Sequence, residues 1–405
     1  MSASASKESQ ERKAGLSHSL WEVLQVSLKL GLTSFGGPMA HLGYFHEEYI
    51  RRRKWMDERS YADLVALCQF LPGPASSQVG IGIGIMRAGL LGGLVAWLGF
   101  TLPSVLALVL FAFLLKGLDL GDAGWIHGLK LVAVAIVAQA VLGMGQKLTP
   151  DRKRVTIAIA AAAITLLWQT AWSQVWIILA AGVIGYFLYP HPQPADLPEL
   201  RVPVRRSVAV VSLLLFFALL IGLPLLRNVA SFHGLAMFDS FYRAGSLVFG
   251  GGHVVLPLLE REVVPAGWLP KEDFLAGYGA AQAVPGPLFT FAAYLGAVMD
   301  GWYGAAIATI GIFLPAFLLV LGTLPFWAAL RTNPSIQGAL VGVNAAVVGI
   351  LLAALYAPIW TSTIHTSIDF VPASLLFILL VFWKAPPWVV VIAGAVGGTV
   401  ISFWS

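Results

Sequence analysis

The sequence predicts an all-α polytopic membrane protein made of two inverted-topology repeats, with broken or re-entrant helices at Gly-Gly-Pro and Pro-Gly-Pro motifs. Three observations predict this fold class. Apolar stretches long enough to cross a bilayer recur along the chain, one order of motifs occurs twice, and basic residues lie in different loops of the two halves.

Composition places the chain in a membrane. Of its 405 residues, 58% are apolar and 11% are charged, whereas about 25% of the residues of an ordinary soluble domain are charged. A helix of about 20 apolar residues crosses the hydrocarbon core and satisfies its own backbone polar groups. The stretches that qualify are 90–115, 126–146, 208–226, 305–324 and 336–356. We therefore expect a multi-pass protein of the cytoplasmic (inner) membrane, in contact with membrane lipid.

Charge and cysteine content exclude several other classes. The formal charge of +5 comes from basic loops and does not indicate a nucleic-acid partner. Cys68 is the only cysteine, which excludes an intrachain disulfide and a cysteine-built metal site. The polar first residues are not followed by an apolar stretch with a cleavage site, so we expect residues 1–19 to form a cytoplasmic tail. No cofactor is expected.

One order of motifs occurs twice. Gly31–Pro38 matches Gly245–Gly252, and the two ranges lie 214 residues apart. Trp55, Gln69–Pro74, Leu102-Pro103 and Ile126-x-Gly128 match Trp268, Gln282–Pro287, Leu314-Pro315 and Ile336-x-Gly338, with a spacing that falls only to 210. Such self-similarity indicates a tandem duplication. We predict a first repeat at 20–148, a connector with transmembrane helices at 149–230 and a second repeat at 231–405.

Basic residues and the number of crossings predict that the repeats are inverted. Arg51–Lys54 is strongly basic, whereas the equivalent 263–269 contains no Lys or Arg. Because short cytoplasmic loops carry an excess of Lys and Arg, the two loops are expected on opposite faces. If residues 61–86 dip into the membrane and return, five crossings separate the starts of the repeats, at 90–115, 126–146, 155–168, 172–189 and 208–226. An odd number inverts the second repeat, as in many secondary transporters.

Both repeats interrupt apolar sequence twice with residues that end helices. The interruptions are Phe35–Pro38, Leu71–Pro74, Phe249–Gly252 and Val284–Pro287. Glycine adopts non-helical backbone angles, and proline suits the first position of a helix. The N-terminus of a half-helix attracts anions, so four breaks aimed at one centre predict an anion site. The structural alternative is that these residues only kink helices or allow close packing.

Side chains near the breaks complete the predicted site. Lys29 and Arg243 each lie six residues before the repeated phenylalanine, where two cations would suit a dianion; the alternative is snorkelling toward lipid headgroups. Glu47 and Glu260 also correspond, and either carry a coupling proton or pair with neighbouring arginines. The residues predicted to bind substrate are Lys29, Phe35, Gly36, Gly37, Pro38, Gln69, Pro72, Gly73, Pro74, Ser76, Ser77, Arg243, Phe249, Gly250, Gly251, Gly252, His253, Gln282, Pro285, Gly286, Pro287 and Thr290.

These motifs resemble the chromate ion transporter family. Phe35–Pro38, the Trp55 loop, Gln69–Pro74 and their second-half counterparts carry the resemblance, which is strongest to the long-chain members with two fused homologous domains. It implies efflux of chromate, with sulfate as the look-alike tetrahedral dianion. The second half departs from the pattern, with Gly252 where Pro38 stands in the first.

Other functional classes are disfavoured by the motifs. The sequence has no Gly-x-x-x-x-Gly-Lys-Ser/Thr loop, so direct ATP drive is not expected. His46-Glu47-Glu48 lacks a second histidine at helical zinc spacing, which disfavours an intramembrane enzyme. The expected substrate is therefore a small inorganic oxyanion, chromate or alternatively sulfate or another anion, and a homodimer is left open.

Overall fold

The computed structural model describes residues 2–118, 124–168, 170, 173–189, 204–229, 232–249, 252–331 and 333–402. Every regular element in this part of the chain is a helix, which confirms the predicted all-α class. Five of the described segments are long and apolar enough to cross a membrane, namely Ala75–Lys116, Gly124–Leu148, Arg206–Val229, Leu288–Phe326 and Ser335–Trp360. Each of them contains one of the five apolar stretches predicted from the sequence.

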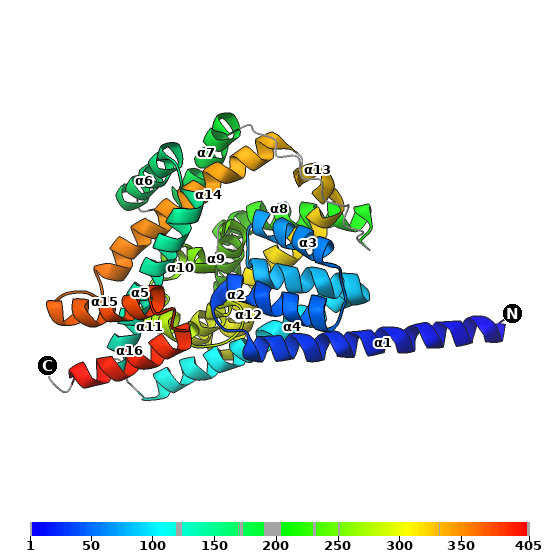
Figure 1. Cartoon of the computed structure of the whole chain (residues 1–405), viewed down its shortest axis with the longest axis horizontal. Coiled ribbons are helices and arrows are strands. Elements are labelled where there is room, and N and C mark those ends of the chain that lie inside the picture. The colour runs from blue at the N-terminus through cyan, green and yellow to red at the C-terminus, as the bar shows by residue number, and fades with distance from the viewer. Residues whose placement is uncertain are drawn as a thin grey trace.

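The helices follow one another in a similar order in the two halves (Figure 1). The first half contains α1 (Ser2–Thr33), α2 (Gly37–Phe45), the π-helical η1 (His46–Arg52), α3 (Glu58–Phe70), α4 (Ala75–Leu118), α5 (Gly124–Leu148), α6 (Arg152–Leu167) and α7 (Ser173–Leu188). A single helix, α8 (Arg206–Val229), comes next among the described residues. The second half contains α9 (His233–Leu247), η2 (Gly252–Val254), α10 (Val255–Val263), α11 (Lys271–Ala281), η3 (Leu288–Thr290), α12 (Phe291–Thr323), η4 (Leu324–Phe326), α13 (Trp327–Arg331), α14 (Pro334–Ala354), η5 (Leu355–Trp360), α15 (Ser367–Val381) and α16 (Pro387–Ser402).

Polar residues before several helices fix where those helices begin. The Asp57 side chain accepts hydrogen bonds from the backbone N–H groups of the first turn of α3, and Asn333 does the same for α14. Thr366 and Asp369 form a capping box at the start of α15. Such caps satisfy N–H groups that have no acceptor within the helix. These starts therefore follow from local sequence.

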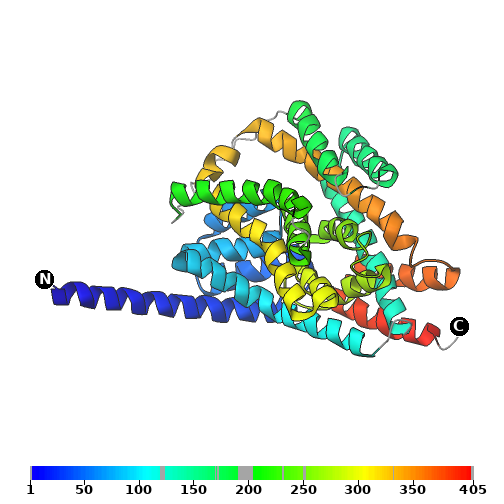
Figure 2. The same cartoon turned by 180° about the vertical axis from the view of Figure 1, so that it is seen from behind.

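Two long helices fold back on themselves at equivalent points. The chain reverses at Ala88-Gly89 in α4 and at Asp300-Gly301 in α12. The limbs of each hairpin pack closely, because Gly84 lies against Gly92 and Gly296 lies against Gly304. Figure 2 shows α4 (cyan) beside α12 (yellow), and the two hairpins pack against each other. The first limb of α4 spans about 20 Å and is too short to cross a bilayer alone.

Residues 58–87 form a second hairpin in the first half. Leu64 of α3 lies against Gly82 of α4, where a larger residue would collide with it. The chain therefore runs into the protein along α3 and returns along the first limb of α4. The expectation that residues 61–86 dip into the membrane and return stays a prediction.

The last helices of each half pack on the long helix of the other half. In Figure 1, α6 and α7 lie beside α14, and α15 and α16 lie beside α5. Glycines form both contacts, since Gly185 meets Gly338 and Gly128 meets Gly394. Small residues at crossings let helix backbones approach closely without any hydrophobic drive from lipid. The halves are thereby interlocked.

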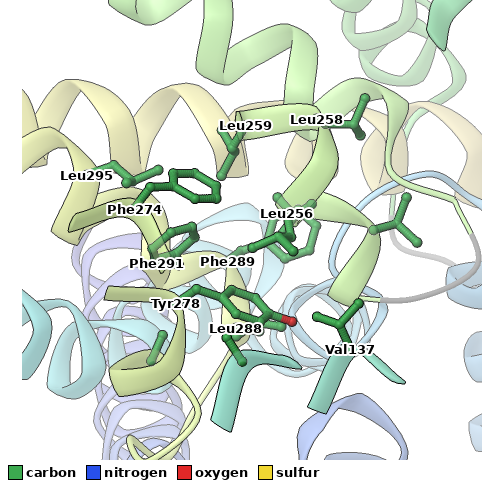
Figure 3. Packing of buried hydrophobic residues seen from close by; sticks show 14 of the residues in the cluster. Val137, Leu256, Leu258, Leu259, Phe274, Tyr278, Leu288, Phe289, Phe291 and Leu295 are labelled. Carbon is green, nitrogen blue, oxygen red and sulfur yellow. The ribbon is translucent and has the colours of Figure 1, made fainter. Parts of the chain in front are cut away.

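Aromatic side chains fill the core between α10, α11 and α12. Phe274, Tyr278, Phe289 and Phe291 are at most 1% exposed and pack with Leu288 and Val137 of α5 (Figure 3). Elsewhere large apolar side chains face outward, among them Leu214, Ile221 and Leu225 of α8. A soluble protein rarely exposes such a surface, but lipid covers it in a membrane.

Candidate functional site

The first Gly-Gly-Pro motif breaks the chain between α1 and α2. Gly36 and Gly37 have φ of +96° and +78°, values that glycine adopts at little cost. Pro38 lies at the start of α2, where its missing N–H group leaves no intrahelical bond unmade. In the second half, α9 ends at Leu247 and η2 begins at Gly252. The predicted residues Gly250 and Gly251 lie outside the described residues.

The Pro-Gly-Pro motifs break both halves at the predicted positions. Residues 71–74 separate α3 from α4, and Gly73 has φ of +118°. In the second half, residues 282–287 separate α11 from η3, and Gly286 has φ of +97°. Pro74 and Pro287 immediately precede the following helices, as predicted.

The breaks of the two halves are hydrogen-bonded to each other reciprocally. The Gly73 N–H donates to the Val248 carbonyl at 2.7 Å, and the Gly286 N–H donates to the Ser34 carbonyl at 2.9 Å. Gly73 and Gly286 occupy the same place in the two repeats, as do Ser34 and Val248, which directly precede the repeated phenylalanines. Such exchanged contacts are typical of two units related by a two-fold rotation. The structure therefore brings the described breaks together at one crossing point.

A cavity of about 990 Å³ lies beside this crossing. Its wall combines the first break with the second break of the other half. The predicted residues that line it are Phe35, Gly36, Gly37, Pro38, His253, Gln282 and Gly286. α5 and the segment between α15 and α16 complete the wall. Its lining does not include Lys29, Gln69, Pro72, Gly73, Pro74, Ser76, Ser77, Arg243, Phe249, Gly252, Pro285, Pro287 or Thr290.

His253 and Gln282 are polar residues of the cavity wall near the helix breaks of the second half. The His253 ring Nδ1 lies 2.8 Å from the Tyr278 hydroxyl, which fixes the imidazole against α11. The Gln282 Nε2 group is buried, and the Gln282 side chain lies close to the same Tyr278 hydroxyl. A buried amide donor beside a cavity can also donate to a ligand bound there.

A buried polar cluster lies at the start of α4. The His41 Nδ1 is 3.2 Å from the Ser76 hydroxyl. The Gln78 Nε2 donates to the Pro72 carbonyl at 2.8 Å and so stabilises the break. The Ser77 hydroxyl is buried and has no partner among the described residues. The Thr290 hydroxyl, by contrast, donates to the Pro287 carbonyl within its own segment.

The two predicted cations make ion pairs with carboxylates. Lys29 lies 2.7 Å from Glu48, and Arg243 lies 3.0 Å from Glu262 and 2.9 Å from Asp239. These pairs correspond between the repeats, because 29 and 243, like 48 and 262, are 214 residues apart. Both cations are thus neutralised nearby. Their predicted role in binding a dianion stays a prediction.

The predicted correspondence of Glu47 with Glu260 stays a prediction. The ion pairs single out a different pair of acids, because Glu48 and Glu262 make equivalent contacts with Lys29 and Arg243. Glu48 points inward and its side chain is 7% exposed, whereas the Glu47 side chain is 46% exposed and lies 3.2 Å from Arg52. Glu47 therefore pairs with neighbouring arginines, the alternative stated for it above. A coupling role for Glu47 or Glu260 stays a prediction.

Comparison with known proteins identifies the relatives of this chain. The family model of chromate transporters matches residues 21–186 and again residues 235–399. The chain belongs to the chromate transporter family. The first matched range extends past residue 148, so it takes in α6 and most of α7 and leaves α8 between the two matches.

Curated members of this family align over most of the chain. The chromate transport protein of Pseudomonas aeruginosa is 31% identical over 329 residues, 80% of this chain and 77% of that protein. The probable chromate transport protein of Synechococcus elongatus is 28% identical over 405 residues, 96% of each chain. The chromate transport protein of Cupriavidus metallidurans is 27% identical and covers 84% of this chain and 82% of that protein. No solved structure matches the chain significantly.

The sequence motifs did not reveal the second wall of the cavity in this family member. Lys147 of α5 and Lys384 after α15 line it, together with Gln139, Gln146 and Trp388. None of these residues belongs to a repeated motif, so comparison of the two halves could not find them. The one available signal was Lys147, which lies close to the basic Arg152–Arg154 stretch.

Proposed function

We propose that this protein carries chromate out of the cytoplasm through the cavity at the crossing of its helix breaks. Its family supports the substrate class, as do the printed names of relatives that align over most of the chain. The observation that carries the proposal is the reciprocal bonding of Gly73 to Val248 and of Gly286 to Ser34, next to a cavity. Broken backbone at membrane depth is expected where a substrate path passes.

Chromate would bind where Phe35–Pro38 lines the cavity. The first turn of α2 starts there, and the N–H groups of a first helical turn have no acceptors within the helix. They carry a partial positive charge that favours an anion. Glycine at positions 36 and 37 leaves the backbone open to a ligand, and Gln282 supplies a further donor from the other half.

The membrane potential would supply the energy for export. Moving one charge across 100 mV corresponds to about 2.3 kcal/mol, so a dianion that leaves an inside-negative cell releases about 4.6 kcal/mol of free energy. No coupled ion is then needed on energetic grounds. Anion exchange is compatible with the same cavity.

Flux measurements in proteoliposomes test this proposal. We expect saturable chromate flux that increases when the compartment of origin is made negative, with sulfate as a competitor. Strong sulfate flux without chromate flux would overturn the substrate while leaving the transporter class intact. Neither flux would overturn the transport proposal itself.

A matched pair of glutamines tests the cavity. Gln282→Ala removes a buried amide donor from the cavity wall and is expected to raise the KM for chromate roughly tenfold, since hydrogen bonds to charged groups are among the strong ones. Gln69→Ala alters the equivalent repeat position, which is exposed and outside the cavity lining, and should change KM much less. Equal effects would argue against this cavity as the binding site.

A further inference from the structure

The cavity is lined by two cations and no carboxylate. Lys147 and Lys384 are the charged residues of its described wall. Neither lysine makes an ion pair or hydrogen bond among the described residues, in contrast to Lys29 and Arg243, which are held by acids. A cavity of one sign with low-dielectric walls concentrates ions of the opposite sign. Its field therefore favours anions.

The two lysines come from different halves of the chain. Lys147 lies in the last turn of α5, and Lys384 follows the end of α15. Both are exposed, as is Gly36 of the first break, whereas Ala281 and Leu288 of the same wall are buried. The two lysines and the break at Gly36-Gly37 therefore share the open part of one cavity.

The distribution of basic residues predicts that the exposed part of the cavity faces the cytoplasm. Lys147 is followed by Arg152, Lys153 and Arg154, a basic stretch of the kind that cytoplasmic loops carry. The repeat spacing of 210 residues, which relates Gly128 to Gly338, pairs Lys147 with Ala357. The duplicated position in the second half therefore carries no cation, and Lys147 is specific to the first half.

We propose that Lys147 and Lys384 form a cytoplasmic capture site for a tetrahedral dianion, which then passes to the helix breaks. This inference rests on the proposed function for the identity of the ion. A purely structural role is the competing explanation, because a cation near the end of a helix stabilises the helix dipole. The two differ in what they predict, since a dipole role changes stability and a capture site changes affinity.

Equilibrium dialysis of the purified full-length protein against chromate measures capture without transport. The variants are Lys147→Gln, Lys384→Gln and the double variant, with Lys147→Arg/Lys384→Arg to keep the charge. Lys153→Gln is the matched control, because Lys153 belongs to the same basic region but lies outside this cavity. We expect roughly tenfold weaker binding in the double glutamine variant, an unchanged Tm, and a smaller dependence of binding on salt.

In proteoliposomes the same double variant should raise KM and leave the maximal rate nearly unchanged. If the wild-type protein binds chromate and the double variant binds it equally well, the capture site is overturned and the proposed function stands. A lower Tm with unaltered affinity would favour the helix-dipole role and would also overturn the capture site. Sulfate dialysis runs in parallel. If sulfate binds through the lysines and chromate does not bind, the capture site is supported and the chromate proposal fails; if neither anion binds, both fail.

Discussion

Single glycines decide whether the helix breaks can form. Gly286 combines φ of +97° with a backbone N–H that bonds the other half, and a Cβ built on it would lie 2.9 Å from the Ser104 hydroxyl. Gly73 has φ of +118°, and a Cβ there would lie 3.0 Å from the Gln78 Nε2. The motifs predict the breaks from sequence. They do not predict the exchanged bonds, because a backbone N–H has no side chain that identifies its acceptor.

Alanine at these glycines should therefore damage both stability and transport. We expect Gly286→Ala and Gly73→Ala each to cost about 1–2 kcal/mol from the left-handed backbone alone, with close contacts adding to this. Thermal unfolding in detergent and chromate flux measure the two effects. Gly143→Ala is the control, since a Cβ at Gly143 would meet no atom within 4 Å. If all three variants behave alike, the breaks are not held by these conformations.

Ion pairs join the first helix of each half to the helix after its glycine break. Lys29–Glu48 links α1 to η1, and Arg243–Glu262 links α9 to α10. The pairs differ in burial, because the Lys29 side chain is 49% exposed and the Arg243 side chain is 7% exposed. Both halves thus keep an ion pair at this position, but the pair is buried in the second half and partly exposed in the first.

Removing the two cations should have unequal consequences. Arg243→Ala leaves Asp239 and Glu262 buried with one cation fewer, and breaking such a buried pair costs about 3–5 kcal/mol. Lys29→Ala leaves Glu48 with Arg52 and Arg53 and should cost less than about 1 kcal/mol. The fraction that stays monodisperse after heating, measured by size-exclusion chromatography, compares the two. A larger loss in Lys29→Ala would contradict this explanation, and Arg243→Lys serves as the charge-keeping control.

At the scale of the whole molecule, the sequence predicted the helical class, the duplication of motifs and the places where helices break. It could do so because apolar length, glycine and proline are local signals. It did not predict that α6 and α7 pack on α14 while α15 and α16 pack on α5. Apolar helix faces in lipid carry little pairing information, and glycines such as Gly185 and Gly338 look the same at a crossing or in a loop. Lys147 and Lys384 stayed hidden for a similar reason, since only folding brings the ends of α5 and α15 to one cavity.

The inverted orientation of the halves is the remaining prediction about the whole molecule. The exchanged bonds of Gly73 and Gly286 support a two-fold relation. The basic Arg51–Lys54 loop and its uncharged counterpart predict that the axis lies in the membrane plane. Single cysteines in a Cys68→Ala background test it, because Cys68 is buried and its removal leaves no other thiol.

We expect Lys54→Cys, in the exposed loop before α3, to react with a membrane-impermeant maleimide only from the cytoplasmic face. Ala266→Cys, in the exposed equivalent loop before α11, should react only from the opposite face. Lys153→Cys on α6 is the cytoplasmic reference, and its labelling pattern should match that of Lys54→Cys. Labelling of positions 54 and 266 from the same face would make the repeats parallel. The axis relating them would then stand along the membrane normal, and the two sets of breaks could not present opposite ends to the two sides.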